Sequence, residues 1–109
     1  MAYDPVIAER IRTALADEPS VTERKMFGGV GFMVEGAMAI AASSDGAVLA
    51  RVGPAHADAL IGEGVEPMIM RGREMRGWLR VAPDAVAADA NLAAWVARGV
   101  AFVRSPEAK

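Results

Sequence analysis

The sequence predicts an α+β fold in which an antiparallel sheet is covered by helices on one face. Two observations lead to this fold class. Apolar residues recur at helical spacing near both ends of the chain, and between them lie short apolar runs joined by the turn signals Glu35-Gly36 and Asp45-Gly46. The expected element order is α-β-β-β-α-β-β-α, within one domain that covers residues 1–109.

The first half of the chain is expected to form one helix and three strands. A helix is predicted from Pro5 to Ala16, because apolar side chains recur every four residues. The first strand begins at Val21, continues through a glycine-rich segment and ends at Val34. Residues 37–42 and 47–52 form the second and third strands. Three strands joined by two tight turns make an antiparallel meander.

The second half is expected to add a helix, two strands and a final helix. Gly53-Pro54 opens a helix over residues 55–61, and strands follow at 65–70 and 77–81 with a polar connection between them. The last helix starts near Asp89 and carries apolar residues at spacings of three and four. Gly99 inside this helix indicates close packing against the sheet.

Composition excludes several classes of function. The chain has 109 residues, a formal net charge of −2, no cysteine and one histidine, His56. The absence of cysteine excludes thiolate catalysis, disulfides and cysteine-ligated metals. No Asp-x-Asp-x-Asp loop is present, so we expect neither a metal nor a cofactor. No signal peptide or stretch of about 20 apolar residues is found, so we expect a cytoplasmic protein without membrane contact.

Residues 27–32, Phe-Gly-Gly-Val-Gly-Phe, are an unusual segment for a strand. Glycine weakens a strand by about 0.5–1 kcal/mol relative to alanine, so this cluster indicates a constraint. The spacings of phosphate-binding loops, G-x-G-x-x-G and G-x-x-x-x-G-K-S/T, are absent. We favour a glycine bulge that coils the first hairpin. The alternative is that a partner or ligand lies against this segment, at Phe27, Gly28, Gly29, Gly31 and Phe32.

The seven methionines suggest a second candidate surface. Met68 and Met70 share one face of a predicted strand, while Ile69 takes the other face. A strand that is apolar on both faces needs a helix on one side and a second subunit or partner on the other. Core filling is the simpler interpretation, because methionine fills irregular cores as well as adaptable interfaces. A homodimer is one form of the interaction hypothesis.

Residues 71–80 carry four arginines, Arg71, Arg73, Arg76 and Arg80, opposed only by Glu74. Trp78 lies among them, and arginine beside an aromatic residue is typical of nucleic-acid contact. The acidic chain as a whole favours a solvated strand face, with Trp78 in the core. Nucleic-acid binding is therefore disfavoured and remains the alternative hypothesis.

His56 is the one candidate general base of the histidine type. No nucleophile motif accompanies it, so we favour an isolated surface histidine. An enzymatic or small-molecule role would require a pocket lined by His56.

A family resemblance adds to these observations. Residues 24–38, Arg-Lys-Met-Phe-Gly-Gly-Val-Gly-Phe-Met-Val-Glu-Gly-Ala-Met, resemble the opening motif of the TfoX N-terminal domain family. Residues 49–52, 66–67, 78–83 and 92–95 continue the resemblance, which spans about Ile7 to Phe102. It implies a two-layer α/β sandwich with a five-stranded antiparallel sheet, akin to secretion chaperones.

The resemblance also implies a function. TfoX-like proteins are associated with regulating competence genes for DNA uptake, as coactivators rather than enzymes, and the family offers no catalytic residues to transfer. The full-length regulators carry a further C-terminal domain that has no counterpart here, so we expect a stand-alone bacterial N-terminal domain. Our hypothesis is that the chain is a non-enzymatic protein-interaction or regulatory module. Its protein partner is unidentified, and the transcriptional machinery is one candidate.

Overall fold

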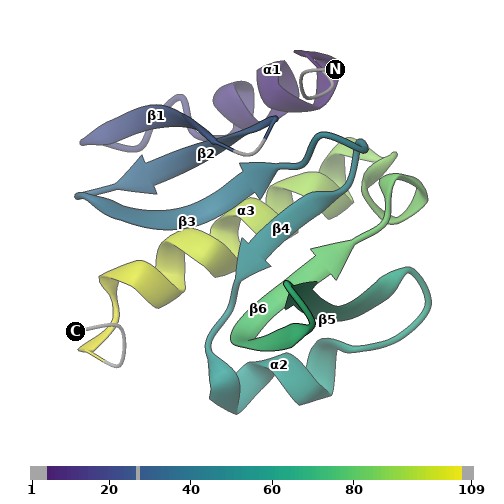
Figure 1. Ribbon diagram of the computed structural model, residues 1–109. Coiled ribbons are helices and arrows are strands. Elements are labelled where there is room, and N and C mark those ends of the chain that lie inside the picture. Colours follow the sequence, from purple (N-terminus) through teal and green to yellow (C-terminus); the bar gives the residue numbers. More distant parts are fainter. Residues whose placement is uncertain (1–4, 27, 107–109) are drawn as a thin grey trace.

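The computed structural model describes residues 5–26 and 28–106, which form three helices and one six-stranded antiparallel sheet (Figure 1). The elements in chain order are α1 (Pro5–Ala14), β1 (Val21–Met26), β2 (Gly29–Val34), β3 (Ala37–Ala42), β4 (Val48–Arg51), α2 (Pro54–Leu60), β5 (Val65–Met70), β6 (Arg73–Val81), the 3₁₀ turn η1 (Pro83–Val86) and α3 (Asp89–Arg104). The strands are ordered β1-β2-β3-β4-β6-β5. The predicted α+β class is confirmed. In this part of the chain, no helix has the length and apolar character that crossing a bilayer requires.

The sheet has six strands and not the expected five, because the first predicted strand is divided in two. β1 ends at Met26, β2 begins at Gly29, and these two residues are paired. Gly28 has a φ of 78°, a left-handed conformation that glycine adopts without steric cost and that allows the chain to reverse. Phe27 lies outside the described residues. The glycine segment therefore contains a hairpin turn where the sequence predicts a bulge.

The other predicted elements are close to those observed. Glu35 and Gly36 have φ values of 52° and 84° and connect β2 to β3, as the turn signal predicts. β5 coincides with the predicted strand 65–70. β6 begins at Arg73 rather than at residue 77, because the turn of this hairpin takes only residues 71–72.

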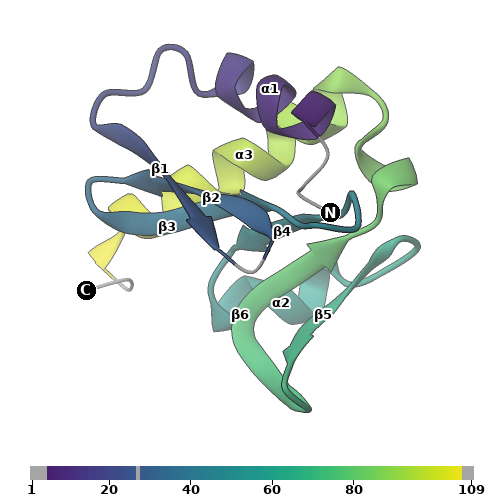
Figure 2. The same cartoon turned by 45° about the horizontal axis from the view of Figure 1, so that its top comes forward.

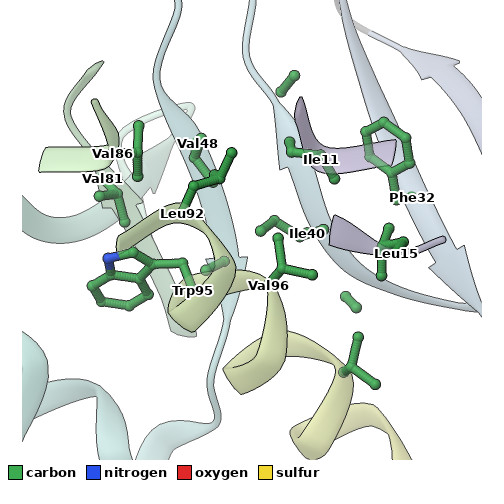
Figure 3. Close-up of a cluster of buried hydrophobic side chains, with 14 of the residues drawn as sticks. Ile11, Leu15, Phe32, Ile40, Val48, Val81, Val86, Leu92, Trp95 and Val96 are labelled. Atoms are coloured by element: carbon green, nitrogen blue, oxygen red, sulfur yellow. The ribbon is translucent and has the colours of Figure 1, made fainter. Parts of the chain in front are cut away.

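The hydrophobic core lies between the sheet and helices α1 and α3, which share one face (Figure 3). Phe32 of β2 is the largest fully buried side chain. Gly99 lets α3 approach β3 closely, as predicted, because a Cβ atom there would lie 3.1 Å from the carbonyl carbon of Ala39. α2 packs against β6. The sheet face opposite α1 and α3 carries partly exposed residues such as Leu49, and we call it the open face.

Candidate functional site

The open face carries an apolar pocket of about 310 Å³, which we name the methionine pocket. Its walls are the large apolar side chains Met38, Leu49, Met68, Met70, Met75 and Trp78. Small residues also line it, among them Gly29, Ala41, Ala42, Ser43 and Ser44. A volume of this size is typical of sites that accept a small ligand or an anchoring side chain.

A bulge in β6 shapes this pocket. Pro67 of β5 pairs with Leu79 of β6, and Ile69 pairs with Glu74, which leaves one residue on β5 and four residues, 75–78, on β6 between the two pairs. Extra residues on one strand bend a hairpin and increase its twist. Figure 2 shows the resulting curvature of β6. The curvature brings Met70 of β5 to the same pocket as Gly29 of β2, although the two strands are far apart in the sheet.

Gly77 fixes the bulge. Its φ is 85°, and a Cβ atom there would lie 3.0 Å from the Cδ of Pro54, so no other residue fits without strain. The carbonyl oxygen of Gly77 accepts hydrogen bonds from the N–H groups of Val52 (2.8 Å) and Gly53 (3.0 Å). The hairpin is thereby anchored to the connection between β4 and α2.

Gly29 and Gly31 of the glycine-rich segment adjoin the methionine pocket, and each is needed for a different reason. A Cβ atom on Gly29 would lie 3.4 Å from the carbonyl carbon of Ala42 and still closer to its oxygen. A Cβ atom on Gly31 would meet the side chain of Met38, 3.0 Å from its sulfur. Gly29 therefore permits backbone packing, and Gly31 provides the space that Met38 occupies.

The structure brings together the two segments that the interaction hypothesis names. Met68 and Met70 line the pocket together with Gly29, and Gly31 lies beneath Met38 in the pocket wall. Met68 is 8% exposed, and Met70 is half-buried. Sequence alternation alone predicts that Met68 and Met70 lie on one strand face. The fold places Gly29 and Gly31 on the same face of the sheet.

Phe32 and Gly28 of the predicted glycine surface do not line the pocket. Phe32 has no exposed surface and belongs to the core, so a partner at the open face meets no part of it. Gly28 lies in the exposed β1–β2 turn. The prediction for Phe27 falls outside the described residues.

Sequence reasoning missed four wall residues: Met38, Leu49, Met75 and Trp78. It placed Trp78 in the core and Met75 in a polar connection. Trp78 is half-buried on the open face, because Leu79 beside it points to the core. The available signal was that β3 is apolar at both alternating sets of positions, which indicates apolar surface on both sheet faces.

The predicted arginines divide into two groups. Arg71, Arg73 and Arg76, which we name the hairpin arginines, are exposed on the β5–β6 hairpin and form no ion pair within residues 5–26 and 28–106. Arg80 instead forms ion pairs with Asp45 and, at 3.6 Å, with Glu66. Of the four predicted arginines, only the hairpin arginines are therefore without an ion pair among the described residues, and they share their hairpin with Met70, Met75 and the exposed Glu74.

Arg80 lowers the pKa of Asp45 chiefly through a hydrogen bond to its carboxylate. A second hydrogen bond, from the Ala47 N–H at 3.2 Å, acts in the same direction, while burial opposes both. Because the folded pKa lies below its ordinary value of 3.8, the pair stabilises the fold above that pH. The stabilisation is lost as the pH falls through the lower, folded value.

We expect the variant Asp45→Asn to reduce the loss of stability between pH 7 and pH 3 by about 0.2–1 kcal/mol, since the pair is half-exposed and screened. Urea unfolding at both pH values measures this difference. Glu63→Gln is the control, because Glu63 is exposed and forms no ion pair in the part of the chain that the structure describes. An unchanged pH dependence in Asp45→Asn would contradict the assignment.

His56 lines a second cavity, between α2 and α3, together with Arg98 and Ser105. The hydroxyl of Ser105 donates a hydrogen bond to the Phe102 carbonyl at 2.6 Å and closes the end of α3. This serine is therefore engaged with the main chain and is not aligned as a nucleophile. Within residues 5–26 and 28–106, no group of three or more histidine, aspartate or glutamate side chains is placed to hold a metal ion.

The chain matches a known protein family. The family model described as the TfoX N-terminal domain matches residues 13–103, a region that contains all six strands and most of α3. No curated protein and no solved structure matches the chain.

Proposed function

Because the chain belongs to the TfoX N-terminal domain family, a regulatory family not known as enzymatic, we propose that it is a non-enzymatic interaction module that binds a protein partner through the methionine pocket. One observation supports this proposal above all. An apolar pocket lined by four methionines lies on the open face of the sheet. Methionine side chains are flexible and polarisable, so they suit a surface that adapts to another protein.

The charges beside the pocket indicate the chemistry of the partner. The hairpin arginines are exposed next to its methionine wall and carry no ion pair within the described residues. A partner segment with an apolar anchor of leucine or phenylalanine type and with nearby acidic residues would satisfy both features. We propose that this partner belongs to the transcriptional machinery that expresses competence genes.

The variant Met70→Glu should lose the partner, because a charged carboxylate would replace an apolar side chain in the pocket wall and would have to be desolvated when the partner binds. We expect at least about a tenfold loss of captured partner, as at interface hot spots. The measurement is capture from lysate of the native host, quantified by mass spectrometry. Ile69→Glu is a matched control on the same strand, because Ile69 is 59% exposed and does not line the pocket.

A protein retained by the wild type and Ile69→Glu but lost from Met70→Glu supports the proposal. Equal retention by all three, with folding verified by circular dichroism, contradicts it. Light scattering tests the homodimer version, in which a second copy covers the open face. A monomer at high micromolar concentration, for both wild type and Met70→Glu, removes that version.

The hairpin arginines also favour a second candidate, nucleic-acid binding. Retention of DNA or RNA should then decrease with salt and fall when Arg71 and Arg73 become alanine. Arg80→Ala is the control, because Arg80 is engaged by Asp45 and Glu66. An absence of retention at low salt ends this alternative.

A further inference from the structure

The cavity lined by His56 is distinct from the methionine pocket. It lies between α2 and the C-terminal half of α3, on the side of the sheet that the helices cover, and its volume is about 380 Å³. Apolar side chains, including Val52, Leu60 and Phe102, form most of its wall. Cavities of this size that combine apolar walls with a few polar groups are typical of small-molecule sites.

Both helices contribute a small residue to the lining of the cavity. α2 contributes Ala59, and α3 contributes Ala101. Phe102 is held at the back wall by its close approach to Gly53, where a Cβ atom would lie 3.3 Å from the Cζ of the phenylalanine ring and closer to other ring atoms. The aromatic wall is therefore fixed by the main chain at the start of α2.

Arg98 and Phe102, which both line the cavity, each take part in a contact between an arginine and an aromatic ring. The guanidinium carbon of Arg98 lies 4.6 Å from the centre of the Trp95 ring, and that of Arg51 lies 5.1 Å from the centre of the Phe102 ring. A guanidinium that stacks by its face keeps N–H donors at its edge for an acceptor. Neither arginine forms an ion pair with the described residues.

Among the described residues that line the cavity, the charged side chain is that of Arg98. His56 and Arg98 line it, and no carboxylate of the described residues does so. Asp58 on α2 is exposed and is not among the lining residues. An anion that enters the cavity would therefore meet basic partners without a competing carboxylate.

We propose that this cavity binds an apolar carboxylate, a monocarboxylic acid with a short aliphatic or aromatic body. The carboxylate accepts hydrogen bonds from Arg98 and His56, and the apolar body packs against Leu60 and Phe102. We expect the site to bind this ligand without catalysing a reaction, because the Ser105 hydroxyl donates a hydrogen bond to the Phe102 carbonyl and is not aligned as a nucleophile. This site is separate from the methionine pocket, so the proposal does not depend on the proposed protein partner.

The test is a titration with octanoate, followed by ¹⁵N–¹H NMR of the full chain. We expect saturable shifts at residues 52–60 and 98–105, with a dissociation constant of about 0.1–1 mM for a ligand of this size. Octanol, which has the same chain length without the charge, should bind about tenfold more weakly. Arg98→Gln should weaken octanoate binding by a similar factor, and Arg76→Gln, on the β5–β6 hairpin, should not.

A pair of filling variants tests the location. Ala101→Phe places a ring in the cavity and should abolish binding, whereas Ala90→Phe, at an exposed position of α3 away from the cavity, should not. Both alanines are exposed, so the variants should fold, and thermal unfolding verifies this. The proposal is overturned if octanol binds as tightly as octanoate or if folded Arg98→Gln binds octanoate as tightly as the wild type does. It is also overturned if the chemical shifts map to the methionine pocket, or if no shift saturates below about 10 mM octanoate.

Discussion

Gly99→Ala is expected to lower the free energy of unfolding by about 2 kcal/mol, although alanine is the better helix former by about 1 kcal/mol. The added Cβ would lie 3.1 Å from the carbonyl carbon of Ala39 and closer to its oxygen. β3 cannot yield, because it is hydrogen-bonded between β2 and β4. α3 must therefore move away from the sheet, and overpacking of this kind costs about 3 kcal/mol.

Urea unfolding measures this difference, and Gly62→Ala is its control. A Cβ atom on Gly62 would have no neighbour within 4 Å. We expect this variant to match the wild type within about 0.5 kcal/mol or to exceed it slightly. A Gly99→Ala protein as stable as the wild type would show that α3 does not approach β3 as closely as described.

Gly29→Ala should also destabilise the fold, by about 2–3 kcal/mol, and Gly31→Ala should cost less than about 1 kcal/mol. The difference follows from what each Cβ would meet. At Gly29 it meets the main chain at Ala42 and Ser43, whereas at Gly31 it meets the flexible end of Met38. Met38 can rotate, but main-chain atoms within a sheet cannot.

Unfolding experiments on the two variants test this distinction. Gly31→Ala should in addition displace Met38 toward the methionine pocket, which a shift of its methyl resonance in NMR spectra would reveal. Equal losses of stability in the two variants would contradict the assignment of one glycine to backbone packing and the other to side-chain space.

Local patterns were sufficient to predict most of the fold. Helical spacing located α1 and α3, and Glu35-Gly36 fixed the β2–β3 hairpin, since these features depend on neighbouring residues only. The division between β1 and β2 was missed. A bulge and a two-residue turn both use glycine with positive φ, so the sequence of this segment does not distinguish them.

The candidate site was predicted only in part, for a physical reason. Alternation along one strand was enough to pair Met68 with Met70. Joining them to Gly29 and Leu49 depends on the curvature of the sheet, which the bulge at 75–78 determines. Such a long-range consequence of one positive φ at Gly77 is not visible in the local pattern.

The bulge also leaves one wall of the methionine pocket on a hairpin that extends beyond the rest of the sheet. β6 pairs with β4 only as far as Trp78, and the hairpin beyond Gly77 pairs only with itself. Met70 and Met75 therefore lie on a hairpin that is joined to the sheet at one end only, whereas Leu49 lies on β4, between β3 and β6. We therefore expect that a change in the angle of this hairpin would alter the width of the pocket without breaking the hydrogen bonds between the other strands, so that the same residues could hold occupants of different thickness.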